Sequence, residues 1–259
     1  MPFKLDPIKR CAIFLILFAA VAFAFNASVQ LAMHLVATLG FSLVLYAIFS
    51  WATPKHKNVW DTVITGLILF LILHYGSTWT DLVYPLTASF IAMSIKFFIE
   101  YKGSPVVNPT ASSLLITTLI LAFIPGLEAP FVSWWGASYQ GYLSLALMAL
   151  WMLGGLYQWK KWYTVGAFLA VYALGILLRG QGLETLQFAF TDSMLYFFAT
   201  IMLTEPKTSP FKPGHQVAYG AFAAVLIHTL MHFGAPYPAL FALVAANLFQ
   251  MAIRSKKTT

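Results

Sequence analysis

The chain is a succession of long apolar runs separated by short polar segments. A bilayer core of about 30 Å takes roughly 17–25 apolar residues of helix, and ten runs approach that length. They cover residues 8–25, 28–51, 59–75, 82–98, 109–124, 142–157, 163–178, 186–203, 216–233 and 239–253. The pattern predicts an all-α integral membrane protein with ten transmembrane helices, in a single polytopic domain over residues 1–259.

The positions of the basic residues predict an orientation for these helices. With the N-terminus inside, 14 of the 15 Lys and Arg residues fall on inner segments or inner span ends, and only Arg179 falls outside. Cytoplasmic loops carry this excess of Lys and Arg. We therefore expect both termini in the cytoplasm of a bacterial-type cell, with the chain in the inner membrane. A signal peptide is the alternative for residues 8–25, which follow a basic start and precede small residues.

Composition narrows the function classes. The chain is 60% hydrophobic and 9% charged, with a mean hydropathy of +0.80, which excludes a soluble enzyme and a secreted disulfide scaffold. The net charge of +7 is spread thinly between apolar runs, so no nucleic-acid partner is expected. The single cysteine, Cys11, excludes an internal disulfide or a cysteine-based metal site, and we identify neither a metal site nor a catalytic residue.

Ten helices divide into two sets of five, and an odd number per set gives the two sets opposite orientations. Such inverted repeats are common in membrane proteins. We expect approximate repeats over residues 1–125 and 140–259, each with a proline-punctuated segment before its last helix. These segments are residues 101–111 and 234–239.

Three polar islands interrupt the apolar pattern. The first, residues 102–110, contains Asn108 as a candidate N-cap and Pro109 at the first helical position, so the following helix N-terminus offers free N–H groups. The second, residues 203–215, contains Glu205 and prolines that prevent a continuous helix. Each island is either a stiff structural turn or part of a ligand site. The third, residues 130–141, is an aromatic segment on the outer side.

Four histidines fall in the outer parts of their predicted spans: His34, His74, His228 and His232. Intramembrane histidines are functional candidates by default. Three roles fit them, namely haem ligation, lining of a quinone pocket, and hydrogen bonding between helices.

The islands, in this order, resemble the NqrB/RnfD family, which comprises the flavin-bearing membrane subunits of sodium-translocating NADH:quinone reductase and of the Rnf complex. Residues 107–111 read Val-Asn-Pro-Thr-Ala, residues 153–157 read Leu-Gly-Gly-Leu-Tyr, and residues 203–210 read Leu-Thr-Glu-Pro-Lys-Thr-Ser-Pro. They are similar to the family's Phe-Asn-Pro-Ala, Leu-Gly-Gly-Leu and Thr-Asp-Pro-Val-Thr-Ser-Pro. The resemblance extends over about residues 80–253, and the chain is nearer to RnfD in size.

The resemblance implies a membrane electron-transfer subunit with a non-covalent flavin, riboflavin or FMN, near the cytoplasmic side. Asn108 and Glu205 would flank the flavin ring. The implied cofactor-binding residues come from the first two islands and are Asn108, Pro109, Thr110, Thr204, Glu205, Thr208 and Ser209.

Two departures from the family pattern bear on this implication. The family's covalent FMN is attached to a threonine in an outer Asp-Gly-x-Thr-Gly-Ala-Thr segment, whereas residues 132–138 here read Val-Ser-Trp-Trp-Gly-Ala-Ser, leaving Ser138 as the covalent candidate. The family's aspartate is Glu205 here. One inner flavin does not connect two membrane faces about 30 Å apart. We therefore expect partner redox subunits, with a membrane quinone as a further candidate partner, besides the lipid itself.

Two other function classes remain open. A solute channel or transporter with a urea-transporter-like inverted-repeat fold fits broken helices and repeats equally well. A scaffold subunit without any cofactor fits the loss of the outer flavin segment.

Overall fold

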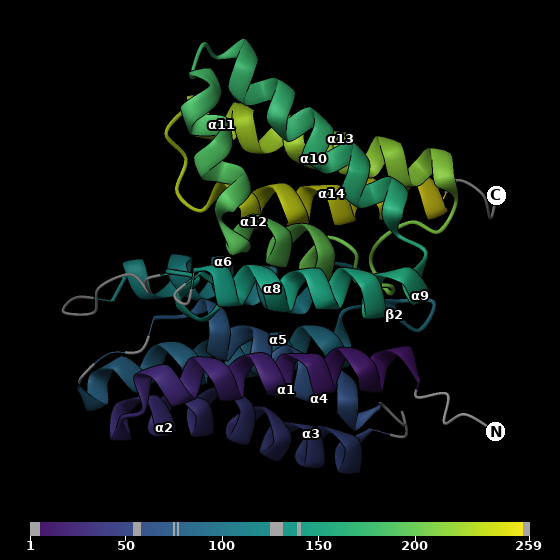
Figure 1. The fold of residues 1–259 in the computed structure, drawn as a ribbon. Helices are drawn as coiled ribbons and strands as arrows, with labels where there is room; N and C mark the ends of the chain where they lie inside the picture. Colours follow the sequence, from purple (N-terminus) through teal and green to yellow (C-terminus); the bar gives the residue numbers. More distant parts are fainter. Residues whose placement is uncertain are drawn as a thin grey trace, which may run out of the picture. The chain divides into compact units, whose positions relative to one another are not determined.

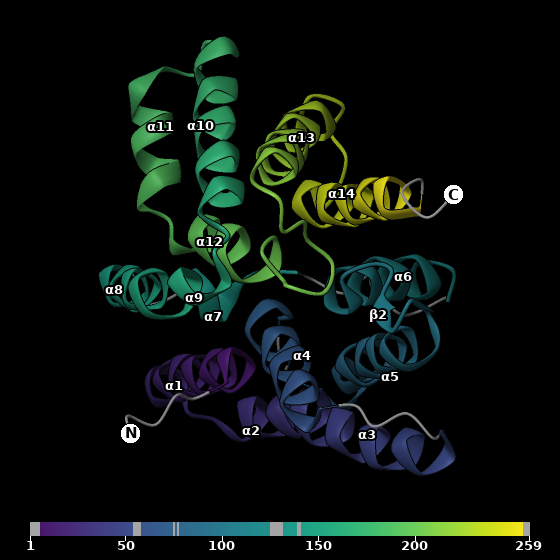
Figure 2. The same cartoon turned by 90° about the vertical axis from the view of Figure 1, so that its right-hand side faces the viewer.

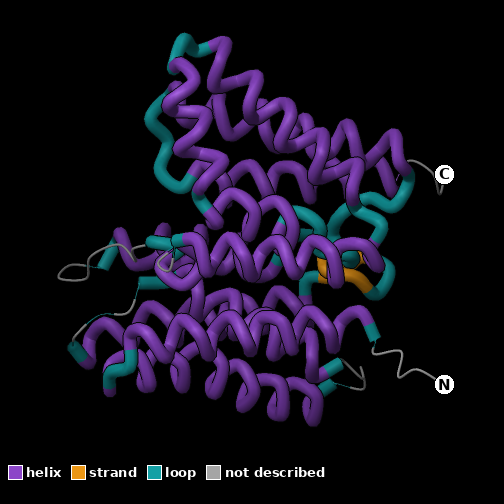
Figure 3. Tube along the Cα trace, viewed as in Figure 1, coloured by secondary structure: helices purple, strands orange, loops and turns teal. Residues whose placement is uncertain are grey.

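Helices make up nearly all of the structure. The computed structural model describes residues 6–53, 58–74, 76, 78–124, 132–138 and 141–255. Within these residues the one sheet is a short pair, β1 (Glu100–Tyr101) and β2 (Ser104–Pro105) (Figure 3). The all-α prediction is therefore confirmed. The chain divides into two compact units, Met1–Glu100 with Ser112–Gln140, and Tyr101–Ala111 with Gly141–Thr259.

The first unit is built around a deeply buried helix. Its elements are α1 (Pro7–Asn26), α2 (Val29–Leu35), the π-helical η1 (Val36–Gly40), α3 (Phe41–Ala52), α4 (Val59–Ile72), the 3₁₀ turn η2 (Trp79–Leu82), α5 (Val83–Phe98), the part of α6 (Pro109–Ala122) from Ser112 onward, and α7 (Trp135–Ser138). Figure 2 shows α4 between α1, α3 and α5. Residues 65–73 are all buried. Gly66 lets α4 approach the backbone of Leu39, which a Cβ at this position would contact at 2.8 Å.

The second unit carries the start of α6 and the helices from α8 onward. Its elements are the N-terminal residues of α6 (Pro109–Ala122), then α8 (Tyr142–Trp151), η3 (Met152–Leu156), α9 (Tyr157–Trp159), α10 (Trp162–Leu178), α11 (Gly182–Thr191), α12 (Ser193–Phe197), η4 (Phe198–Met202), α13 (Pro213–His232) and α14 (Pro238–Ser255). Helices α10 and α13 pack side by side, and α14 packs on α13 (Figures 1 and 2). Gly220 makes the first of these contacts close, because its Cα faces the Thr164 carbonyl of α10.

One predicted span, residues 186–203, is not a continuous helix. Helix α11 ends at Thr191, and α12 begins at Ser193. Asp192 has an extended backbone with ψ 120°, and its carboxylate accepts a hydrogen bond from the Met194 N–H at 2.9 Å. A carboxylate at this position is a favourable N-cap, so it starts a new helix rather than continuing the old one. The prediction of one helix is wrong here.

Helix length separates two helical segments from the others. Among the described residues, Pro7–Asn26 and Val29–Ala52 are long and apolar enough to cross a membrane, the latter formed by α2, η1 and α3 in succession. Shorter apolar helices include Val59–Ile72, which has 14 residues. At about 1.5 Å per residue this helix rises only about 21 Å. Ten full-length spans therefore stay a prediction.

The division into units brings two polar islands together. The expected repeats put residues 101–111 with the first half of the chain. In the structure Tyr101–Ala111 belongs to the second unit, with residues from Gly141 onward. The start of α6 therefore lies in the same unit as the Glu205 segment. The site described next is contained within that unit.

Candidate functional site

The start of α6 is fixed by Asn108. Its side-chain oxygen accepts a hydrogen bond from the Ala111 N–H at 2.9 Å, which is N-cap geometry, and Pro109 occupies the first helical position. Asn108 is 3% exposed, and Thr110 in the same turn is also buried. The N-cap predicted from the sequence is confirmed.

The Glu205 segment is a compact turn after η4. The Thr204 hydroxyl donates to the Thr200 carbonyl at 2.5 Å, at the end of the helical segment. The Glu205 carbonyl then accepts from the Thr208 N–H at 3.2 Å and from the Ser209 N–H at 3.0 Å. The Ser209 hydroxyl donates to the same carbonyl at 2.8 Å. Pro206 and Pro210 prevent a helix from continuing, so these hydrogen bonds close the turn instead.

These two segments meet through their side chains. The Asn108 Nδ2 donates to Glu205 Oε2 at 2.9 Å, and the Thr208 hydroxyl donates to the same oxygen at 3.2 Å. Asn108 and Glu205 are separated by 97 residues in the sequence. Hydrogen bonds to an ionised carboxylate are stronger than neutral ones. The structure thus places the Asn-Pro and Thr-Glu-Pro motifs in direct contact.

Helix α14 adds a residue that the sequence analysis missed. Asn247 is 1% exposed, and its Oδ1 accepts from the Asn108 backbone N–H at 2.6 Å. Its Nδ2 donates to the Tyr219 hydroxyl of α13 at 2.6 Å. We call Asn108, Glu205, Thr208, Asn247 and Tyr219 the polar cluster. A lone asparagine within the apolar run of residues 239–253 was the available signal, because buried amides require partners.

Two basic side chains donate hydrogen bonds to backbone carbonyls of the turn. Arg254 of α14 donates from Nη1 to the Lys207 carbonyl and from Nη2 to the Ser209 carbonyl, both at 3.1 Å. Lys161, before α10, donates to the Pro210 carbonyl at 2.6 Å and lies 3.8 Å from the Phe211 ring centroid. Burial, with a smaller contribution from the charge of Arg254, lowers the pKa of Lys161 to about 7. The turn therefore has fixed partners on several elements.

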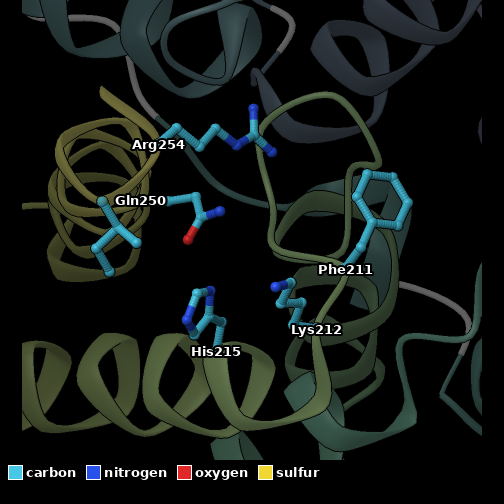
Figure 4. Close-up of a pocket in the computed structure, with 6 residues that line it drawn as sticks. Phe211, Lys212, His215, Gln250 and Arg254 are labelled. Atoms are coloured by element: carbon cyan, nitrogen blue, oxygen red, sulfur yellow. The ribbon is translucent and has the colours of Figure 1, made fainter. Parts of the chain in front are cut away.

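Two cavities adjoin the polar cluster and the turn. One, of about 10 Å³, is lined by residues that include Thr208, Asn247 and Arg254, and it has room for about one water molecule. The other is a pocket of about 170 Å³ between the 211–215 segment and α14 (Figure 4). Pockets for larger organic ligands hold roughly 300–1,000 Å³. Neither cavity has that volume.

The polar groups of the cluster suit a flavin, but the cavities beside them are too small to hold one. An amide, a carboxylate and a hydroxyl supply the donors and acceptors that the polar edge of a flavin ring needs. Asn108 and Glu205, however, are hydrogen bonded to each other at 2.9 Å, so no ring lies between them in this arrangement. A flavin would enter only if the Glu205 turn moved away from the start of α6.

The remaining cofactor candidates have separate surroundings. Ser138 is the last residue of α7, and its side chain lies outside the described part of the structure. In the first unit the His34 ring lies 3.3 Å from the Phe70 carbonyl, and in the second the His228 ring lies 2.9 Å from the Tyr172 carbonyl. Both contacts join two helices, which is the hydrogen-bonding role among the three considered. His74 and His232 are exposed.

Comparison with known proteins adds no family assignment. No protein-family model matches the chain, and a search of curated proteins finds no similar sequence.

Proposed function

We propose that the protein is a polytopic subunit of a membrane electron-transfer complex, similar to RnfD and NqrB, with a flavin site at the polar cluster. The flavin, riboflavin or FMN, would supply one- and two-electron redox chemistry near the cytoplasmic face of a bacterial-type inner membrane. Other redox subunits would provide the electron donor. The acceptor would be a partner subunit or a membrane quinone.

The membrane part of the proposal is supported by apolar side chains on the outside of the helices. Leu17 is 57% exposed, Val36 67%, Leu153 75% and Leu178 78%. Proteins in water rarely expose large contiguous apolar patches, because water disfavours apolar surface. The asymmetric placement of Lys and Arg supports cytoplasmic termini and many spans.

The contact between Asn108 and Glu205 is the observation that carries the flavin part. The resemblance predicts that these residues, far apart in sequence, flank one ligand. They are neighbours, with 2.9 Å between Nδ2 and Oε2, and both belong to segments that break or begin helices. Irregular backbone at membrane depth is tolerated where protein or a cavity satisfies its polar groups. In the proposal the cluster is the closed form of the site, and the Glu205 turn is its moving part.

The test is an absorption spectrum of the protein, purified gently from membranes together with its partners, before and after acid precipitation. We expect a flavin spectrum that acid releases into the supernatant. Flavin that remains in the pellet would instead indicate a covalent link and direct attention to Ser138. A haem band would favour the histidines. A colourless protein would contradict the proposal and leave the transporter or scaffold.

A pair of matched variants tests whether the flavin binds at the polar cluster. Glu205→Gln keeps the side-chain shape but removes the charge next to Asn108. Glu184→Gln makes the same chemical change at an exposed position on α11. We expect the flavin content to fall about tenfold in the first variant and to stay unchanged in the second, because one charged hydrogen bond contributes about 1.5–3 kcal/mol. Equal flavin contents would contradict the assignment.

A further inference from the structure

The pocket of about 170 Å³ lies at one end of the second unit, apart from the polar cluster. It is lined by the 211–215 segment and by the last turns of α14, through Phe211, Lys212, His215, Gln250, Ile253 and Arg254. Figure 4 shows Lys212, His215 and Gln250 pointing toward the space between α13 and α14. Its volume suits a small group rather than a whole cofactor.

The polar groups around this pocket favour an anion. Lys212 and Arg254 are cationic, His215 has an N–H donor in either protonation state, and none of the six lining residues is acidic. The hydrogen bonds from Arg254 to the Lys207 and Ser209 carbonyls fix its guanidinium at the wall. Helix α13 begins here, at Pro213, and the Lys212 side chain does not cap it. The N-terminus of a helix is the positive end of its dipole and favours anions.

Gln250 is an independent indication of a ligand. Only 5% of Gln250 is exposed, and its side chain points into the pocket (Figure 4). Within the described part of the chain no hydrogen bond to its amide is found. The amide therefore faces the pocket space, where a water molecule or a ligand can supply its hydrogen bonds. A ligand oxygen accepting from its Nε2 would do so.

The carbon-rich walls narrow the kind of anion. The Phe211 ring is 66% exposed beside the pocket, and Ile253 and the methylene stems of Lys212 and Arg254 form much of its lining. A free phosphate ion gains nothing from such surfaces. A lipid gains from both parts, because its phosphate meets the cations while its glycerol and first methylenes contact carbon. Basic pockets between transmembrane helices on the cytoplasmic side are known to bind anionic head groups.

We infer that this pocket binds the phosphate group of an anionic phospholipid, held by Lys212, His215, Gln250 and Arg254. The inference rests on the membrane part of the proposed function and is independent of the flavin. Bound lipid would bridge the 211–215 segment and α14.

The experiment is native mass spectrometry of the full chain, purified in detergent and mixed with phosphatidylglycerol or with zwitterionic phosphatidylcholine. We expect phosphatidylglycerol to bind about fivefold more tightly or better, and Lys212→Gln to reduce its affinity about fivefold. Gln250→Leu should also weaken it. Lys102→Gln is the control, since it removes a charge predicted on the same face but outside the pocket.

Equal binding of the two lipids, or equal losses in Lys212→Gln and Lys102→Gln, would overturn the inference. Displacement of the lipid by millimolar inorganic phosphate would identify a site for soluble phosphate and would overturn it as well. Flavin content is recorded on the same samples. A flavin-free protein that keeps the lipid preference would contradict the electron-transfer proposal alone.

Discussion

Asn108 links three elements through one side chain and one backbone amide. Its oxygen caps α6, its Nδ2 reaches Glu205, and its N–H donates to Asn247 of α14. The asparagine amide supplies an N-cap acceptor and a separate uncharged donor from one short side chain. An aspartate would place a second carboxylate against Glu205.

Replacement of Asn108 should therefore cost more than a cap alone. Asn108→Ala removes the cap, worth about 1 kcal/mol, and a hydrogen bond to a charged group, worth about 1.5–3 kcal/mol. We expect the free energy of unfolding to fall by about 2–4 kcal/mol, measured by denaturant unfolding in detergent. Asn58→Ala removes the N-cap of α4 only, and should cost about 1 kcal/mol. Similar losses in the two variants would show that the Glu205 contact contributes nothing.

Lys161 gives the stability a pH dependence. Its pKa is lowered from 10.5 to about 7, so between these values the unfolded chain holds a proton that the folded chain has released. Stability therefore rises as the pH increases from about 7 toward 10, by at most about 1.4 kcal/mol per pH unit. Thermal unfolding of the wild type and of Lys161→Gln over this range provides the measurement. An unchanged slope in the variant would exclude Lys161 as its source.

The sequence identified some residues of the polar cluster and not others. Asn108 and Glu205 lie in motifs with proline neighbours, which distinguish them from the apolar runs on either side. Asn247 and Tyr219 lie inside apolar helices, where helical periodicity alone does not reveal what they face. Lys161 was assigned to a cytoplasmic segment by its charge, yet it is fully buried under Phe211.

Of the helix contacts that contain a glycine, the contact between α10 and α13 brings two backbones closest together. The Gly220 Cα lies against the Thr164 carbonyl and near the Phe168 amide, where any side chain would collide with backbone. Gly166 of α10, in contrast, has no neighbour within 4 Å of an added Cβ. The two positions form a matched pair.

Substitution of these glycines should have opposite effects. Gly220→Ala forces the helices apart and should destabilise the protein by about 1–3 kcal/mol, the usual cost of overpacking. Gly166→Ala should be neutral or stabilising by up to about 1 kcal/mol, because alanine has the higher helix propensity. Thermal unfolding of both variants tests this. Destabilisation by Gly166→Ala, or tolerance of Gly220→Ala, would contradict the described packing.

Breaks within helices were the feature of secondary structure that hydropathy predicted least well. Hydropathy reads residues 186–203 as one apolar run, because a single Asp192 barely changes a window average. Its carboxylate nevertheless caps α12 and separates it from α11. The start of α6 was predicted, since Pro109 occupies the first helical position. Helix α13 begins at Pro213, three residues before the apolar run predicted to start at residue 216.

For the whole molecule, the central expectation is the membrane orientation. Lys102 is exposed next to β1 and is predicted to be cytoplasmic, whereas Arg179 is exposed after α10 and is predicted to face outward. Cys11 is fully buried, so the native chain offers a background with little thiol labelling. These three positions allow a direct test.

In intact cells, a membrane-impermeant maleimide should label Arg179→Cys and not Lys102→Cys. Both should react after permeabilisation, because both side chains are exposed to solvent in the structure. The readout is a mass shift on a gel. Labelling of both variants in intact cells would contradict the orientation. Labelling of Lys102→Cys alone would invert it.

The flavin content per chain is the most direct test of a redox site at the polar cluster. It is measured on the wild-type protein, purified with its partners in mild detergent, by absorption and by identification of the flavin that acid releases. We expect about one non-covalent flavin per chain, and its loss in Glu205→Gln but not in Glu184→Gln. A preparation without flavin, from cells in which the complex is assembled, would contradict the proposal that the polar cluster is a redox site.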